Sequence, residues 1–187
     1  MGLYEIGDRS PDVPQDVYLA PGSQVVGDVA IGSGSSVWFN AVLRGDQHPV
    51  RVGARTNVQD LCVVRAAVAP CRIGSDVTIG SGAVLHGCNV ADRVLIGSGA
   101  VLLDGVEVGE ESIVAAHAMV RVGFKVPPGS LVAGVPAEIK RELSPAERAA
   151  IRQSARSYVE RAEDYRVRLR AAQFRPPPQD AEDAPAG

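Results

Sequence analysis

The sequence predicts a mainly β fold, in which hexapeptide-repeat coils form a parallel β-helix that is followed by a C-terminal α-helix. The first observation is that aliphatic side chains recur every six residues, and a glycine follows many of them, as in "IGSGSSV" and "IGSGAVL". A six-residue period fits neither an amphipathic helix nor one long strand, but it suits a short strand and a corner repeated around a narrow prism. The second is that only 4% of residues are aromatic whereas 20 are glycine, which indicates many short strands in close approach.

The coils can be followed by their aliphatic positions from residue 31 to residue 126. These positions are Ile31, Val37, Leu43, Val52, Val58, Val64, Ile73, Ile79, Leu85, Val90, Ile96, Leu102, Val108, Val114, Val120 and Val126. Three hexads make one coil of 18 residues, as the step from 90 to 108 shows. The steps from 31 to 52 and from 52 to 73 are each 21 residues, so we expect loops to leave the prism at "DQHPV" and "AAVAPC". One residue is missing between Leu85 and Val90.

After the last coil the pattern changes to that of an amphipathic helix. Ser144 is a good N-cap, Pro145 suits the first helical position, and Glu147 completes a capping box. We expect the helix to run from 145 to about 173, with an apolar stripe that packs on the prism. The stripe consists of Ile151, Ala155, Tyr158, Ala162, Tyr165 and Leu169.

The chain therefore divides into three parts. Residues 1–140 form the β-helix domain, and residues 141–175 contain the C-terminal helix packed on it. Residues 176–187, "PPPQDAEDAPAG", are rich in proline, alanine and acidic residues, and we expect them to be disordered.

Composition excludes several classes of function. A net charge of −3 without a basic cluster argues against a nucleic-acid partner. No apolar run approaches the roughly 18 residues that a membrane-spanning helix needs. The three cysteines, Cys62, Cys71 and Cys88, are an odd number in a chain without an apolar signal segment. They indicate reduced thiols and a cytoplasmic protein.

Three basic side chains share one position in successive coils. Arg44, Arg65 and His86 each follow the last aliphatic residue of their coil, at intervals of 21 residues. Equivalent positions of neighbouring coils lie about 4.8 Å apart, so the three side chains should form a column. Such a column needs nearby anions or carboxylates, for which Asp46 and Asp60 are candidates. A solvated polar edge is the alternative explanation.

Three stretches resemble the gamma-class carbonic anhydrases and their relatives, some of which are described as ferripyochelin-binding proteins. They are "AVLRGDQHPVRVGARTNVQDLCVVR", "VTIGSGAVLHGCNVADRVLIGSGAVLLDGV" and "PPGSLVAGVPAEIKREL". The resemblance covers about residues 15–170. It implies a left-handed β-helix, a homotrimer and a zinc site between subunits.

The resemblance also implies which residues stand at the zinc site. Members of the family bind zinc through three histidines, whose positions correspond here to Arg65, Ser81 and His86, with Ser81 contributed by the neighbouring subunit. Only His86 is a histidine, and arginine and serine do not replace the other two ligands. We therefore predict no metal ligand set, no cofactor and no CO₂ hydration activity. Arg44, Asp46, Gln59, Asp60 and Tyr158 match further family positions: Arg44 and Asp46 resemble a pair that ties subunits together, and Gln59 and Tyr158 are either pocket or packing groups.

Several functions remain open at this stage. In one hypothesis Arg65 replaces the charge of the metal, which makes the pocket of Arg65, Ser81 and His86 a site for a small anion or carboxylate. The opposing interpretation is that Arg65 pairs with Asp60 or with an acid of a neighbouring subunit and plugs a dead site. A repurposed enzyme acting on an acyl or carboxylate substrate is the alternative, with His86 or His48 as general base. A hexapeptide acyltransferase is the third and weaker hypothesis.

Overall fold

The structure is a computed structural model, and it describes residues 1–172. Its central feature is a left-handed parallel β-helix of about seven turns with one long helix alongside. The predicted aliphatic positions all point inward and are buried, so the six-residue period identified the core correctly. They belong to one continuous apolar cluster that runs along the axis of the prism.

Each coil contributes a strand to each of three faces of the prism. The first face contains β8 (Cys71–Ile73), β11 (Asn89–Val90), β14 (Glu107–Val108) and β17 (Lys125–Val126). The second face contains β2 (Tyr18–Leu19), β4 (Ser36–Val37), β6 (Asn57–Val58), β9 (Thr78–Ile79), β12 (Leu95–Ile96), β15 (Ile113–Val114) and β18 (Ser130–Gly134). The third face contains β7 (Val63–Arg65), β10 (Val84–His86), β13 (Val101–Leu102) and β16 (Met119–Val120).

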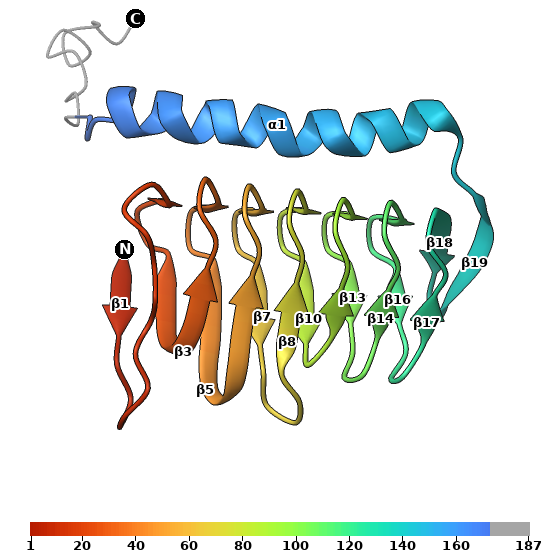
Figure 1. The fold of residues 1–187 in the computed structure, drawn as a ribbon, viewed down its shortest axis with the longest axis horizontal. Helices are drawn as coiled ribbons and strands as arrows, with labels where there is room; N and C mark the ends of the chain where they lie inside the picture. Colours follow the sequence, from red (N-terminus) through yellow and green to blue (C-terminus); the bar gives the residue numbers. More distant parts are fainter. Residues whose placement is uncertain (173–187) are drawn as a thin grey trace, which may run out of the picture.

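Five further elements complete the fold. β3 (Gln24–Ile31) and β5 (Val42–Val52) are long strands that pass from the third face to the first without a break. β1 (Gly2–Tyr4) pairs with the start of β3, and β19 (Ala137–Glu142) pairs antiparallel with β18 at the other end. α1 (Pro145–Arg168) then runs back along the whole row of coils (Figure 1).

The insertions and the missing residue have different structural outcomes. The loop expected at "DQHPV" is wrong, because these residues lie within β5, whose pairing with β3 absorbs the extra length in a register shift. The loop expected at "AAVAPC" is confirmed for residues 66–70, which contain no strand. The one-residue gap before Val90 falls at Gly87, which has φ +41°. A Cβ there would collide with Asp104 and crowd the Ala69 carbonyl oxygen, so the shortened corner requires glycine.

The start of the helix is as predicted, whereas its end is not. Ser144 caps α1, and the capping box with Glu147 is complete. β-structure continues to Glu142, slightly past the predicted boundary at 140, and the helix ends at Arg168 rather than near 173. Leu169, the last residue of the predicted stripe, is the C-cap with an extended backbone and is exposed, so the stripe ends at Tyr165. The predicted tail at 176–187 lies outside the described residues.

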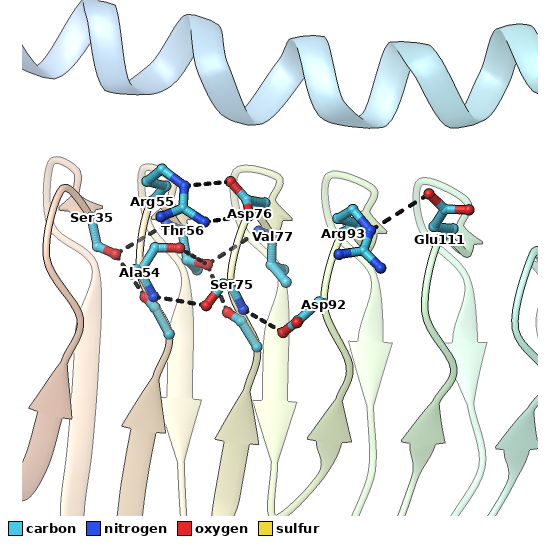
Figure 2. A network of polar contacts seen from close by, with 12 residues as sticks. Ser35, Ala54, Arg55, Thr56, Ser75, Asp76, Val77, Asp92, Arg93 and Glu111 are labelled. Carbon is cyan, nitrogen blue, oxygen red and sulfur yellow. Dashed lines mark hydrogen bonds and ion pairs between the residues drawn. The ribbon is translucent and has the colours of Figure 1, made fainter.

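Charged corner residues connect neighbouring coils, and one of them binds the first half of α1 to the prism. Arg55 makes a two-pronged ion pair with Asp76 one coil further on, with both N···O distances 2.7 Å. Arg93 pairs along the row with two different carboxylates, those of Glu111 (Figure 2) and Glu110. Glu111 also accepts from two arginines of α1, Arg148 at 3.2 Å and Arg152 at 2.7 Å. A ladder of hydroxyl and backbone hydrogen bonds lies beneath these pairs, formed by Ser35, Thr56, Ser75 and Asp92 (Figure 2).

Aromatic residues bind the second half of α1. Trp38 lies on the second face and contacts Tyr158 and Tyr165 of the helix edge-on, with ring centroids 5.3 and 5.1 Å apart. Tyr18 and Ala162 are buried in the same cluster. Edge-on aromatic pairs add about 0.5–1.5 kcal/mol beyond the area that they bury. The helix therefore covers the second face and leaves the other two faces uncovered.

Candidate functional site

The predicted basic column is confirmed by the strand register. Arg44 of β5 lies opposite Arg65 of β7, and Arg65 lies opposite His86 of β10. Each follows a buried residue of the third face, so the alternation of a strand directs all three side chains outward. All three are half-buried. The column stands where the third face ends and the chain turns toward the first face.

The charges of the column are balanced unequally. Arg44 Nε lies 3.1 Å from Asp46 Oδ2, which makes an ion pair within one chain. Among the described residues, Arg65 forms no ion pair, and its Nε is buried without a hydrogen-bond partner. Arg44 Nε is also buried without a hydrogen bond, although its ion pair with Asp46 balances its charge, and the Oδ1 atom of Asp46 is buried without a partner. Leaving a buried donor or acceptor without a partner costs free energy, so Arg65 Nε and Asp46 Oδ1 are candidates for contact with a ligand or a second subunit.

His48 lies next to the column through its backbone. Its N–H donates to the Ala66 carbonyl oxygen at 3.0 Å, and Ala66 directly follows Arg65. The side chain of His48 is half-buried in β5. The sequence candidate His48 is therefore at the same corner as Arg65.

Ser81 belongs to a separate polar chain that begins under the helix. Its N–H and Oγ both donate to Gln59 Oε1, at 3.2 and 3.3 Å. Gln59 Nε2 in turn donates to Asn57 Oδ1 at 3.2 Å, and Asn57 Nδ2 donates to Thr78 Oγ1 at 3.0 Å. Thr78 Oγ1 shares a hydrogen bond of 3.1 Å with Ser154 of α1. Since each amide has one orientation in this chain, Gln59 is held with its oxygen toward Ser81.

Asp60 and Tyr158 lie near this second group. Asp60 follows Gln59, and its Oδ1 accepts from the Phe39 N–H at 3.2 Å. Tyr158 packs on Trp38, and the Arg161 guanidinium lies 4.8 Å from the centre of its ring. Burial raises the pKa of Tyr158 above its ordinary value. Tyr158 thus has a packing role in one chain, with its phenol kept protonated at neutral pH.

The site residues consequently form two half-sites on opposite edges of the third face. We call Arg44, Asp46, His48, Arg65 and His86 the basic half-site, and Gln59, Asp60 and Ser81 the amide half-site. Ser81 follows the second-face strand β9, whereas His86 ends the third-face strand β10 that comes next in the same coil. Within residues 1–172 of one chain, no three histidine, cysteine or carboxylate side chains converge as metal ligands do.

Some of these groups were not identified from the sequence. Asn57, Thr78 and Ser154 connect Gln59 to the helix, and the signal that could have indicated the first two is their 21-residue interval, the same as that of the basic column. The corner pair Arg55 and Asp76 has this interval as well. Ser154 carried no such signal, because its place depends on how the helix lies across the face.

The comparisons with known proteins agree with this fold. The profile "Bacterial transferase hexapeptide (six repeats)" matches residues 87–121, within the regular coils. A solved structure described as a hexapeptide transferase family protein from Anaplasma phagocytophilum superposes with a TM-score of 0.85 at 34% identity, covering 87% of this chain and 97% of that one. The fold and its repeat define a left-handed β-helix protein of the hexapeptide-repeat class.

Sequence relatives narrow the class to one family. "Probable carbonic anhydrase" of Methanocaldococcus jannaschii is 45% identical over 152 residues, which are 81% of this chain and 96% of the relative. "Gamma carbonic anhydrase 2, mitochondrial" of Arabidopsis thaliana is 44% identical over 168 residues, which are 86% of this chain. The chain spans about 60% of the length of this plant relative. The protein belongs to the gamma carbonic anhydrase family. No helix among residues 1–172 is long and apolar enough to cross a membrane.

Proposed function

We propose that this protein is a metal-independent member of the gamma carbonic anhydrase family that binds a small anion or carboxylate between the subunits of a homotrimer. The observation that carries the proposal is the state of Arg65. Its guanidinium has a buried Nε without a partner and lies in register with His86, at the position that the family resemblance gives to a zinc ligand.

The donor chemistry at this site does not fit zinc. A guanidinium stays protonated and offers only N–H donors, so Arg65 cannot coordinate a metal. The Ser81 hydroxyl donates a hydrogen bond to Gln59 Oε1 and is a poor zinc ligand in any case. His86 alone remains, and a structural or catalytic zinc needs at least three protein ligands.

Loss of zinc removes the chemistry of CO₂ hydration. Zinc supplies that chemistry by lowering the pKa of a bound water to about 7, which generates hydroxide at neutral pH. None of Arg65, Ser81 and His86 is a Lewis acid, so a water beside them stays far too weakly acidic to give hydroxide at neutral pH. We therefore expect no appreciable carbonic anhydrase activity with or without added zinc.

An anion satisfies what the basic half-site lacks. Arg44 is neutralised by Asp46, whereas the charge of Arg65 is not balanced by any described residue. A carboxylate or bicarbonate placed against Arg65 accepts two N–H bonds from the planar guanidinium, which is the strongest geometry for such a pair. His86 adds a further donor beside it.

A trimer is supported by the character of the uncovered faces. The outward residues of the third face form an apolar column of Val42, Val63, Val84, Val101 and Met119. The corresponding column of the first face is polar and consists of Arg51, Arg72, Asn89, Glu107 and Lys125. A cyclic arrangement that buries the third face brings the amide half-site of one subunit to the basic half-site of the next, as closed head-to-tail rings do.

We place the protein in the cytoplasm. Cys62, Cys71 and Cys88 are buried free thiols, which suits a reducing compartment.

A repurposed enzyme in the same pocket is the second candidate. The register of His86 beside Arg65 favours it, because an imidazole next to a carboxylate-binding cation is an arrangement for general base catalysis on an acyl or carboxylate substrate. His48 is the other candidate base at this corner. Turnover of small acyl esters that is lost in His86→Ala and kept in His48→Ala would assign the role to His86.

Calorimetric titration tests the proposed function. We expect bicarbonate, acetate or phosphate to bind the wild type, and Arg65→Ala to weaken binding at least tenfold. Arg121→Ala is the matched control, because Arg121 holds the same third-face position three coils beyond Arg65 and is exposed. Absence of binding to any of these anions in a trimeric wild type would contradict the proposal and support a plug in which Arg65 pairs with an acid of the neighbouring subunit.

A further inference from the structure

Two cysteines face each other inside the prism. The Sγ atoms of Cys71 and Cys88 are 3.8 Å apart, and the side chains are 0% and 1% exposed. Cys71 begins β8, and Cys88 immediately precedes β11, in the next coil. The third cysteine, Cys62, donates instead to the Gly80 carbonyl oxygen at 3.1 Å. Only Cys71 and Cys88 are therefore in thiol–thiol contact among the described residues.

The backbone holds these two residues in suitable positions for a covalent bond. Arg72 pairs with Asn89, and the Arg72 N–H donates to the Cys88 carbonyl oxygen at 2.9 Å, so the cysteines that precede this pair lie side by side. Neighbouring strands are about 4.8 Å apart, which lies within the roughly 4.4–6.8 Å between Cα atoms that a disulfide requires. Rotation about χ1 is the main movement needed to bring the sulfurs to bonding distance.

The cysteines also interrupt an otherwise aliphatic column. Val50 occupies the equivalent position one coil before Cys71, and Val106 occupies it one coil after Cys88. Packing alone is thus satisfied by valine at this position. The chain places two thiols where it uses valine on either side, which indicates that their chemistry has a role.

We propose that Cys71 and Cys88 are a redox modification site, at which hydrogen peroxide forms a reversible intramolecular disulfide that clamps together the coils bearing Arg65 and His86. Cys88 lies two residues after His86 across Gly87, and Cys71 follows Arg65 across the 66–70 loop. The disulfide consequently joins the coil of Arg65 to the coil of His86 on the core side of the prism, opposite to the outward-pointing side chains of the basic half-site.

The reaction balances with peroxide as the oxidant. The Cys71 thiolate attacks one peroxide oxygen, so that an S–O bond forms while the O–O bond breaks and hydroxide leaves. The Cys88 sulfur then attacks the Cys71 sulfur, and the hydroxyl group leaves as water as the S–S bond forms. Two thiols lose two electrons and two protons, and one peroxide becomes two waters. The two thiols share a hydrogen bond, and this contact lowers the pKa of Cys71, which favours Cys71 as the attacking thiolate.

Access to the pair comes through the neighbouring loop. Residues 66–70 have no regular secondary structure, and Val68 at its tip is 71% exposed. Loops with few packed side chains open at lower free energy than core strands. We therefore expect oxidation to be slow in the native protein and limited by this opening.

Counting thiols tests the proposal. The reduced full-length chain is treated with hydrogen peroxide, quenched, unfolded and titrated with a thiol reagent. We expect its three thiols to fall to one, with peptide mapping that joins Cys71 to Cys88 and full recovery after reduction. Cys62→Ala is the matched control, because Ala41 and Ala83 hold that position in the adjacent coils, and its two thiols should fall to none. Cys71→Val and Cys88→Val should keep both remaining thiols out of any cross-link.

The clamp has its own readout. A disulfide that closes a loop of this length should raise the midpoint of thermal unfolding by roughly 5–10 °C, and reduction should reverse the shift. Three free thiols after prolonged exposure of a folded wild-type protein would overturn the proposal, as would a cross-link that contains Cys62 or joins two chains. An unchanged midpoint in fully cross-linked protein would overturn the clamp.

Discussion

Truncation of one core side chain, Ile96→Ala, should destabilise several coils together. Ile96 is 0% exposed and stacks between Ile79 of the preceding coil and Val114 of the following coil. The change removes three buried carbon groups, which at about 0.8 kcal/mol each cost roughly 2.4 kcal/mol of transfer free energy. The cavity adds to this cost, because the strands on both sides are held by hydrogen bonds and cannot collapse into it.

We therefore expect Ile96→Ala to lower the free energy of unfolding by about 3–4 kcal/mol, within the range of about 2–5 kcal/mol that is typical for such truncations. For a chain of this size the melting temperature should fall by roughly 6–16 °C. Val122→Ala is the control, since Val122 is 68% exposed, and we expect a change within about 0.5 kcal/mol.

Urea unfolding with two probes measures this effect and its spread. Circular dichroism reports the whole β-helix, and the fluorescence of Trp38, the single tryptophan, reports the coils near the N-terminus. Both transitions should shift together in Ile96→Ala, because neighbouring coils share backbone hydrogen bonds and core contacts. A loss below about 1 kcal/mol, or a Trp38 transition that stays in place, would refute the reasoning.

Two further substitutions test the helix cap and the proposed interface. Glu147 bonds to Arg141 and to the N-cap Ser144, and these bonds lower its pKa from 4.5 to about 2. Its contribution to stability should thus be present above pH 4.5 and should be lost as the pH falls toward 2. In a pH series of thermal unfolding, Glu147→Gln should be less stable than wild type at neutral pH and equal to it near pH 2, and an equal gap at both pH values would contradict this cause. Val84→Glu places a charge in the middle of the apolar third-face column, so it should convert the trimer to monomer in sedimentation analysis, while Arg72→Glu on the first face should leave the trimer intact. A trimeric Val84→Glu protein would show that the third face is not the interface.

Much of the fold was accessible from sequence because one physical pattern repeats. Aliphatic residues at every sixth position are all buried when short strands surround a narrow prism, so the period predicts that fold. Ser144 and Glu147 form a capping box, which specifies the start of a helix locally. The course of "DQHPV" was not accessible, because extra residues can leave a corner as a loop or remain in a bulged strand. Pairing of β5 with both β3 and β8 decides that question, and it is a tertiary property.

The placement of the candidate site residues could also be predicted in part from the sequence. The intervals of 21 residues predicted that Arg44, Arg65 and His86 stack, and the register agrees. The intervals do not reveal hydrogen-bond direction. The fixed orientation of Gln59 toward Ser81 depends on Asn57, Thr78 and a helix that folds back from far along the chain.

Metal analysis of a restored site tests the central claim most directly. If Arg65 and Ser81 occupy two ligand positions of a former zinc site, the double variant Arg65→His/Ser81→His should complete the three-histidine set with His86 of an assembled trimer. After incubation with zinc and gel filtration, we predict about one zinc per subunit in the double variant and none in the wild type. Stoichiometric zinc in the wild-type protein, or none in a trimeric double variant, would contradict the account.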